Sequence, residues 1–393
     1  MWVRPRFSSA RIIPMSRSRH QSFTHVTIIG VGLIGGSLAM AIRNRFPSCV
    51  VTGVDRAEVL RKAIRRGVID IAADSVRSAV CKADLVILSA PIPAILRHLP
   101  LVARCVRPDA VVTDTGSVKD AIVSHAHRLF PHGNFVGGHP MTGSEFSGVR
   151  AAHPLLFENA FFLLTPDRAT SRQDLKRLSG FYSALGARVA VMSPSAHDSV
   201  VAALSHVPQL SAVALIRAAA RQTNVKRHLR LGAGGFRDMT RVASSPFGLW
   251  KDILEHNRKE IRRSLGVLVR ELDEYRRLLW KGPRGLRTQF QRAASIRSNI
   301  PRGMKGFLSQ LPELTVYIPD RPGTLAMITT ALARKGVNIK DLELLKVREG
   351  LGGTFRMAFE SVKERDRARK IVHAAIGAGL EQTSRPRKPP RLR

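Results

Sequence analysis

The chain has 393 residues, of which 44% are hydrophobic and 24% charged, and its formal net charge is +35. This length predicts two or three domains, and the composition is ordinary for a folded globular protein. No apolar run approaches the roughly 20 residues that a membrane-spanning helix needs, so we expect no membrane partner.

The positive charge suggests nucleic-acid binding, but its distribution argues against a specific complex. Residues 1–26 carry five Arg, residues 281–310 seven Lys or Arg, and residues 384–393 five, and none of the three contains an acid. About half of the net charge therefore lies in segments typical of tails or a linker. No zinc finger or RNA-binding aromatic signature accompanies it, so no specific nucleic-acid partner is expected.

The cysteines and the N-terminal segment bear on location. Cys49, Cys81 and Cys105 show no metal-ligand spacing, which favours reduced thiols in the cytoplasm and no bound metal. Residues 1–24 are expected to form a basic, disordered extension. Their Arg and Ser content also suits an organelle transit peptide, and Met15 is an alternative start, so targeting stays open.

Strands and helices alternate over residues 25–193. A short β-branched strand at 25–29 is followed by a glycine-rich run and a helix at 36–42. Further strands are expected at 50–55, 85–89, 110–114, 135–137, 161–165 and 187–191. Such alternation predicts an α/β domain of the Rossmann type, with a parallel sheet covered by helices on both faces.

The glycine-rich run after the first strand is typical of a dinucleotide-binding turn. Gly30 permits a tight turn, Gly32 lets a pyrophosphate approach the backbone, and Gly35 lets the helix pack closely on the strand. The helix N-terminus then points free amides at the phosphates. The expected cofactor-binding turn comprises Gly30, Gly32, Leu33, Ile34 and Gly35.

Two residues after the second strand bear on cofactor choice. Asp55 lies 20 residues after Gly35, where a carboxylate accepts hydrogen bonds from the adenosine ribose hydroxyls, which favours NAD. Arg56 could instead hold the 2′-phosphate of NADP, which therefore stays open.

The pattern changes near residue 193. Residues 194–281 contain no convincing strand and have apolar residues at helical spacing, which predicts an all-α domain. Residues 282–311 are interpreted as a linker. Residues 312–380 predict a small ferredoxin-like βαββαβ domain, whose final strand is weakly marked, and residues 381–393 a basic tail.

Two segments that follow predicted strands carry candidate catalytic groups. Residues 138–148 place His139 in a Gly- and Pro-rich turn together with Ser144 and Glu145. Residues 114–119 include Ser117, which could alternatively cap the next helix. Because ligands bind beyond the carboxyl ends of parallel strands, both segments should face one crevice.

Residues 138–148 resemble the His-Pro-Met/Ile-x-Gly-x-Glu-x-Ser-Gly loop of prephenate and arogenate dehydrogenases. The resemblance implies that His139 accepts the proton of the ring hydroxyl while hydride leaves to the nicotinamide. It also implies that Ser117 lies near the nicotinamide and the substrate hydroxyl. Ser144 and Glu145 would border the substrate at the pocket entrance.

Two helical segments extend the resemblance, which spans roughly residues 25–280. Residues 204–209 match the family's Ser-His-Leu-Pro-His pattern, so His206 would contact the substrate, while Gln209 replaces the second histidine. Residues 236–243 match Phe-x-Asp-x-Thr-Arg-Ile-Ala, whose arginine grips a substrate carboxylate with its bidentate fork. The corresponding residue is Arg241, and the expected pocket walls are Arg237 and Trp250. His197 is interpreted either as orienting a helix start or as part of the site.

The C-terminal segment resembles the ACT domain, on residues 319–326 and 336–339. ACT domains bind amino acids as allosteric effectors. The resemblance implies an aromatic amino-acid effector at Asp320, Gly323 and Asn338.

Taken with the motifs, the resemblance implies oxidative decarboxylation of prephenate to 4-hydroxyphenylpyruvate with NAD, in tyrosine biosynthesis. The substrate would carry two carboxylates, and a homodimer would form through the helical domain. Arogenate, which would give tyrosine, is the alternative substrate. A sensor of amino acids or dinucleotides without turnover is the alternative from another functional class.

Overall fold

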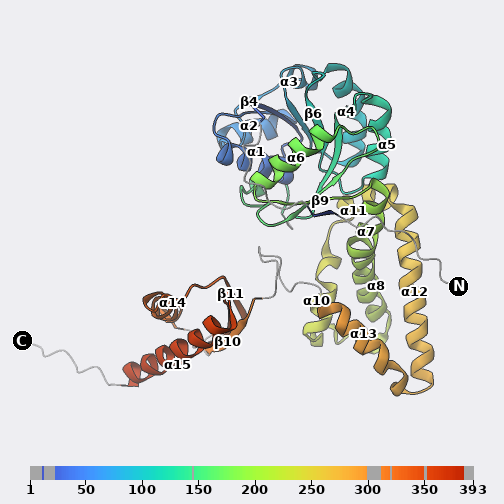
Figure 1. Ribbon diagram of the computed structural model, residues 1–393. Coiled ribbons are helices and arrows are strands. Elements are labelled where there is room, and N and C mark those ends of the chain that lie inside the picture. Colours follow the sequence, from blue (N-terminus) through green and yellow to red (C-terminus); the bar gives the residue numbers. More distant parts are fainter. Residues whose placement is uncertain are drawn as a thin grey trace, which may run out of the picture. The chain divides into compact units, whose positions relative to one another are not determined.

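The computed structural model describes residues 11–12, 23–143, 146–298, 311–318, 321–348 and 352–384. The chain divides into two compact units, residues 1–291 and 292–393. The first contains the predicted α/β and helical domains, and the second contains the small C-terminal domain (Figure 1).

A nine-stranded sheet organises the first unit, in the order β1-β9-β8-β7-β6-β5-β2-β3-β4. The strands from β7 to β4 run parallel, whereas β8 pairs antiparallel with β7, and β1 antiparallel with β9. The predicted sheet is therefore confirmed, but it is mixed rather than wholly parallel. The strands are β1 (Arg11–Ile12), β2 (His25–Ile29), β3 (Val50–Val54), β4 (Ile71–Ala72), β5 (Leu85–Leu88), β6 (Val111–Asp114), β7 (Phe135–Pro140), β8 (Phe161–Thr165) and β9 (Arg188–Val191).

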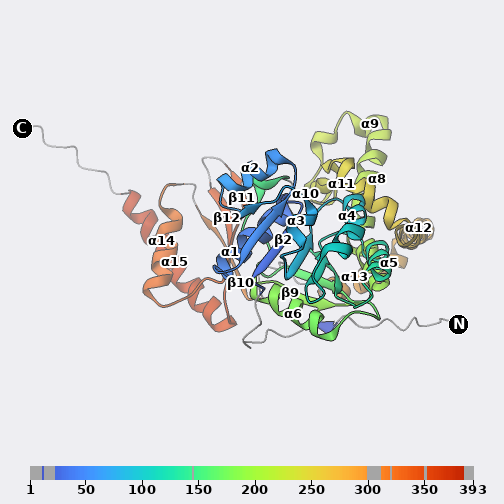
Figure 2. The same cartoon turned by 90° about the horizontal axis from the view of Figure 1, so that it is seen from above.

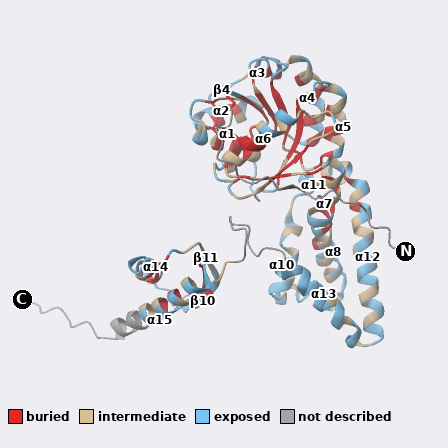
Figure 3. Cartoon of the chain, in the orientation of Figure 1, coloured by how far each residue is buried: buried red, intermediate tan, exposed pale blue. Residues whose placement is uncertain are grey.

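Helices cover both faces of this sheet, and the central strands β5 and β6 are accordingly buried at every position. In β5, Leu85 and Ile87 pack with α1, α2 and α6 on one face, while Val86 and Leu88 pack with α3, α4 and α5 on the other. In Figure 3 the buried residues gather in and beside the sheet. The helices are α1 (Leu33–Arg45), α2 (Ala57–Arg65), α3 (Val76–Val80), α4 (Ile92–Cys105), α5 (Asp120–Leu129) and α6 (Arg172–Ala184), with a 3₁₀ turn η1 at Val149–Ala151. Seen from above in Figure 2, α4 and α5 lie together on one side of the strands.

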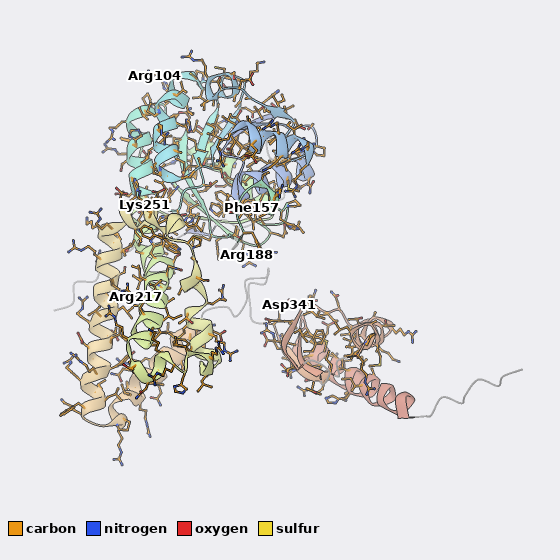
Figure 4. The ribbon with its side chains drawn as sticks, turned by 180° about the vertical axis from the view of Figure 1, so that it is seen from behind. Arg104, Phe157, Arg188, Arg217, Lys251 and Asp341 are labelled. Atoms are coloured by element: carbon orange, nitrogen blue, oxygen red, sulfur yellow. The ribbon has the colours of Figure 1, made fainter. Side chains whose placement is uncertain are left out.

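Helices make up the rest of the first unit, as predicted. They are α7 (Pro194–Val201), the π-helical η2 (Ala202–His206), α8 (Val207–Arg221), α9 (Thr223–Lys226), η3 (Leu229–Leu231), α10 (Gly234–Thr240), η4 (Arg241–Ser244), α11 (Phe247–His256), α12 (Arg258–Trp280), η5 (Pro283–Leu286) and the start of α13 (Arg287–Ser298). The boundary between the two units falls within α13, after Gln291. Many long charged side chains of these helices are exposed, and Figure 4 labels Arg217 of α8 and Lys251 of α11.

One expectation about this region was wrong, and one about the N-terminus was incomplete. The expected linker 282–311 begins with η5 and α13, because Gly282, with φ of +104°, turns the chain and the Arg-, Gln- and Ala-rich sequence after it favours a helix. The expected disordered extension 1–24 includes β1, which adds a short edge to β9. The rest of that extension, apart from residues 23–24, lies outside the described residues.

The expectation that no segment is long and apolar enough to span a membrane also needs correction. The continuous helical run Pro194–Arg221 meets those criteria of length and composition. Core helices of soluble proteins meet them too, and this run packs against α5, α10 and α12. It carries buried polar residues, including His197, Asp198 and His206, which are engaged by other parts of the first unit.

The second unit is a three-stranded antiparallel sheet, in the order β10-β12-β11, packed against two helices. Its elements are β10 (Glu313–Ile318), α14 (Thr324–Arg334), β11 (Asp341–Arg348), β12 (Gly352–Ala358) and α15 (Val362–Ser384). The predicted order βαββα is confirmed, but the final strand is not formed. Residues 380–383 belong to α15, because Leu, Glu and Gln continue a helix more readily than they begin a strand.

Candidate active site

The glycine-rich turn between β2 and α1 is shaped by two close backbone approaches. Gly30 has φ of +100°, and a Cβ there would lie 2.3 Å from the Ser89 carbonyl oxygen. A Cβ on Gly35 would lie 2.0 Å from the Gly30 carbonyl oxygen. Gly32 differs, since nothing lies within 4 Å of the position of its Cβ. The space beside Gly32, at the amino end of the helix that begins with Leu33 and Ile34, fits a cofactor phosphate.

Asp55 follows β3 and faces the same turn. Its carboxylate accepts the backbone N–H of Val31 at 2.8 Å and that of Arg56 at 2.7 Å. These bonds leave lone pairs of both oxygens for ribose hydroxyls. The Arg56 side chain is 88% exposed, so the structure places the acidic group against the turn and the basic group in solvent.

A short chain of contacts links the cofactor turn to the next candidate segment. Gly30 packs against the backbone of Ser89, and the Thr115 hydroxyl donates to the Ser89 hydroxyl at 3.0 Å. Ser117, two residues further on, is partly buried. It does not cap the following helix, because α5 begins at Asp120 and its N-cap residue is Lys119.

His139 is not in a turn after a strand, as its sequence neighbours suggested, but is the penultimate residue of β7. It pairs with Leu163 of β8, whose antiparallel hydrogen bonds extend β7 to Pro140. The side chain is therefore held by a strand of the central sheet rather than by a loop. Ser144 and Glu145 lie outside the described residues.

A buried ion pair holds the end of β7. Lys119 Nζ contacts the Asp114 carboxylate and donates to the Gly138 carbonyl at 2.7 Å, while Asp114 accepts the Gly138 N–H at 3.1 Å. Both side chains are fully buried. Burial raises the pKa of Asp114 and lowers the pKa of Lys119, and their mutual attraction opposes both shifts. The ion pair thus provides hydrogen-bond partners for both the N–H and the carbonyl of Gly138, the residue before His139.

A line of hydrogen bonds connects His139 to the helical part. His139 Nδ1 lies 2.8 Å from His197 Nε2, and His197 Nδ1 lies 2.8 Å from Asp198 Oδ1. Asp198 also accepts the backbone N–H groups of Lys119 at 2.7 Å and Asp120 at 3.0 Å. Burial, together with His197, Lys119 and His206, holds the pKa of His139 well below its usual range. His139 is thus neutral at physiological pH.

His206 lies in the π-helical turn η2, a type of distortion that is frequent at functional sites. Asn257 Nδ2 donates to the Asp198 carbonyl at 2.8 Å and lies 3.3 Å from His206 Nδ1. Burial lowers the pKa of His206 to about 4. Since Asn257 donates to Nδ1, the neutral imidazole carries its proton on Nε2 and is a hydrogen-bond donor there. Its ring meets that of Trp250 edge to face, with centroids 6.0 Å apart.

The two candidate arginines lie on the α10–η4 segment. Arg237 is exposed and its Nε donates to the Gly232 carbonyl at 2.8 Å. Arg241 is exposed at the start of η4. Gln209, which is buried, donates to the carbonyl of Val242 at 2.9 Å and so joins this segment to α8.

Three residues at the centre of the site were not among the sequence-based candidates: Lys119, Asp198 and Asn257. For a fourth, His197, the sequence left a structural and a functional role open, and the structure brings its Nε2 to 2.8 Å from His139 Nδ1. His197 and Asp198 were marked by an adjacent His-Asp pair at a helix start, and Lys119 by its position just after a candidate strand. Asn257 carried no usable signal, because its role depends on contacts with residues about 50 to 60 positions away.

Comparison with known proteins was made on sequence and on structure. The family model for the prephenate dehydrogenase nucleotide-binding domain matches residues 38–191, that for the prephenate dehydrogenase dimerization domain residues 193–289, and that for the ACT domain residues 313–377. A prephenate dehydrogenase of Bacillus subtilis is 37% identical over 358 residues, which cover 89% of this chain and 95% of the relative. A cyclohexadienyl dehydrogenase of Zymomonas mobilis is 34% identical, over 65% of this chain and 88% of the relative.

Two solved structures are similar over about 70% of this chain. Prephenate dehydrogenase from A. aeolicus, in complex with hydroxyphenyl propionate and NAD+, has a TM-score of 0.65 and 30% identity over 70% of this chain and 97% of that chain. Arogenate dehydrogenase of Synechocystis has a TM-score of 0.64 and 31% identity over 70% of this chain and all of that chain. The two proteins are named for different substrates, and their similarity to this chain is nearly equal.

The contrast between Gly35 and Gly32 gives a test of the cofactor turn. Gly35→Ala should destabilise the protein by about 1–3 kcal/mol, because its methyl group meets the Gly30 carbonyl. Gly32→Ala should change the unfolding free energy by less than about 0.5 kcal/mol, yet weaken NAD binding by about tenfold or more, because the methyl group enters the cofactor space. Denaturant unfolding and fluorescence titration with NAD measure the two effects. Equal NAD affinity of Gly32→Ala and the unmodified protein would contradict the assigned cofactor position.

Proposed function

Because the chain belongs to the prephenate dehydrogenase family, we propose that it catalyses the NAD-dependent oxidative decarboxylation of prephenate to 4-hydroxyphenylpyruvate. The observation that carries the proposal is a neutral, positioned base, His139, at the carboxyl edge of the same parallel strands that present the glycine-rich turn. A base and a nicotinamide site at one edge are what oxidation of a carbinol needs.

The reaction follows from these parts. His139 Nε2 takes the proton of the ring hydroxyl, and the C–H electron pair leaves as hydride. NAD, when bound, supplies the hydride acceptor. The ring carboxylate then leaves as CO2, and the electron pair of the broken C–C bond completes the aromatic ring and moves the carbonyl electrons onto the ring oxygen. This phenolate oxygen takes back the proton from the His139 imidazolium, which gives the phenol of the product and restores the neutral base. General-base assistance of this kind typically contributes about 10²–10⁴-fold.

Substrate recognition is proposed for the groups around His139. From the motif, Ser117 is proposed to contact the substrate hydroxyl. His206 is proposed to donate from Nε2 to a substrate oxygen next to Trp250. Arg241 supplies the bidentate fork for a carboxylate, with Arg237 nearby on the same segment. Ser144 and Glu145 are assigned to the entrance by their motif. A neutral donor at His206 suits prephenate, which lacks the ammonium group of arogenate.

Dimerisation through the helical domain is proposed from an apolar groove. Its volume is about 640 Å³, and it is lined mainly by apolar residues of α8, α12 and α10. Leu272 and Val269 of α12 and Met239 of α10 line it while 56%, 49% and 67% exposed. An apolar surface of this kind marks an interaction site. The matched family model describes residues 193–289 as a dimerization domain, so the proposed occupant is a second copy of this chain.

Regulation is proposed for the second unit, with an aromatic amino acid as effector. Residues 313–377 match the ACT domain. Gly323, with φ of +86°, is the N-cap residue of α14 and has no side chain to cap the first amides of that helix. Exposed Asn338 lies in the segment between α14 and β11. Asp320, the remaining candidate, lies outside the described residues. A cytoplasmic location is proposed from the three free cysteines.

The base is tested by His139→Asn. We expect kcat to fall by about 10²–10⁴-fold while the Kd for NAD is unchanged, because the substitution removes only the proton acceptor. The exposed His132→Asn is the control and should keep full activity. Formation of NADH and NADPH is followed with prephenate and with arogenate.

The pH profile belongs to the same experiment. Only neutral His139 accepts a proton, and its pKa is depressed, so kcat should hold as the pH falls through about 6.5 and decline only at more acidic pH. Full turnover by His139→Asn would overturn the assigned base. Turnover of arogenate but not prephenate would make arogenate the substrate and leave the proposed role of His139 unchanged.

The dimer is tested with two matched substitutions. Val269 and Val267 are both 49% exposed on α12, but only Val269 lines the groove. Val269→Glu should shift the protein toward monomer in sedimentation velocity, because it places a charge in the apolar contact, whereas Val267→Glu should not. A monomeric unmodified protein would contradict the proposal.

The effector site is tested with tyrosine. We expect tyrosine to change the initial rate and to raise the melting temperature, because a ligand that binds only the folded state stabilises it. Asn338→Ala should abolish both responses, and Lys335→Ala, an exposed substitution at the end of α14, should preserve them. No response to tyrosine or phenylalanine in either measurement would refute the effector assignment.

A further inference from the structure

We propose that Asp198 and His197 act as positioning residues that fix the tautomer of His139, so that its Nε2 atom is left unprotonated toward the substrate. This inference rests on the proposed role of His139 as the base. It adds two residues of the helical part, and a specific proton arrangement, to that role.

The three side chains form one buried line. Asp198 Oδ1 is 2.8 Å from His197 Nδ1, and His197 Nε2 is 2.8 Å from His139 Nδ1. His197 is completely buried and Asp198 is 3% exposed. Water therefore cannot replace either partner, and each ring nitrogen in the line must be matched by the atom that faces it.

The Asp198 carboxylate determines the direction in which the hydrogen bonds between these three side chains are donated. Its Oδ1 accepts the backbone N–H of Lys119 at 2.7 Å, and its Oδ2 accepts that of Asp120 at 3.0 Å. Burial raises the pKa of Asp198, and the fixed N–H donors at both oxygens, together with Lys119, oppose this shift. These donors leave each oxygen only the role of acceptor, which is the role of the ionised carboxylate. The proton between Asp198 and His197 therefore lies on His197 Nδ1.

The positions of the remaining protons follow because a neutral imidazole carries only one N–H. With Nδ1 protonated, His197 Nε2 has only a lone pair, so it must accept a hydrogen bond from His139 Nδ1. His139 then carries its single proton on Nδ1, and its Nε2 is a free acceptor. A neutral His139 of the opposite tautomer would present an N–H to the substrate hydroxyl and could not take its proton.

The same line stabilises His139 after proton transfer. The new imidazolium keeps its Nδ1 bond to His197, whose other nitrogen is bound to the carboxylate of Asp198. Other ionisable groups near His139 are Lys119, paired with Asp114, and His206. Asp114 already balances Lys119, so Asp198 is the carboxylate through which the transferred charge is compensated.

Kinetics of matched variants test whether His197 acts through His139. His197→Gln keeps an acceptor for His139 but cuts the connection to Asp198, and His197→Leu removes both. We expect kcat to fall about tenfold in the first and by about 10²–10⁴-fold in the second, with NAD affinity unchanged. In the His139→Asn background, His197→Leu should cause no further loss of kcat, because the two residues act as one unit. An equal loss in both backgrounds would overturn the proposal.

The tautomer itself is measured by ¹⁵N NMR of histidine-labelled protein, with the His139→Asn spectrum used for assignment. We expect a pyrrole-type Nδ1 and a pyridine-type Nε2 for His139 in the unmodified protein, and a mixture of tautomers in His197→Leu. A pyridine-type Nδ1 in the unmodified protein would overturn the proposal. Because this readout needs no turnover, it separates failure of the tautomer assignment from failure of the proposed reaction. His197→Gln keeps a polar side chain at this buried position and maintains the test if His197→Leu does not fold.

Discussion

The carboxylate of Asp198 is the interaction on which the arrangement of the site depends. It belongs to α7, yet it accepts the amides of Lys119 and Asp120 at the start of α5. Its own backbone carbonyl accepts from Asn257, between α11 and α12. One residue therefore joins the sheet domain to three helices of the helical part. These contacts hold the proposed base on the sheet and the proposed substrate contact on the helices at a constant separation.

This joint also determines what each histidine can do. Through His197, Asp198 leaves a lone pair on His139, whereas Asn257 leaves an N–H on His206. Burial keeps both rings neutral, because desolvation penalises the cation more than any neighbouring charge here favours it. Two neutral imidazoles with opposite proton positions provide one acceptor and one donor. In water, each imidazole would interconvert between tautomers, and neither role would be fixed.

The sequence allowed the domain order, the cofactor turn and His139 to be predicted, because these depend on local patterns. Gly30, Gly32 and Gly35 are recognisable by their spacing between a strand and a helix, and His139 by its neighbours. The extent of β7 was underestimated, since pairing with β8 continues it through Pro140. The helix α13 and the helical end of α15 were missed because composition alone resembled a linker and a strand. Lys119, His197, Asp198 and Asn257 act across 50 to 80 residues of sequence, and no local pattern encodes such contacts.

The high positive charge of the chain and the neutral histidines of the site act at different stages of binding the proposed substrate, which carries two carboxylates. A net charge of +35 produces a field that attracts carboxylates over roughly the Debye length of about 8–10 Å, and it acts before contact. A free cation beside His139 would hinder the chemistry, because it would oppose the positive charge that the base acquires. Lys119 is a cation near His139 and lowers its pKa, but its ion pair with Asp114 offsets part of this charge while its ammonium group donates to the Gly138 carbonyl. The protein thus places uncompensated positive charge on its surface and compensated charge around the base. Attraction of the substrate and basicity of His139 therefore do not conflict.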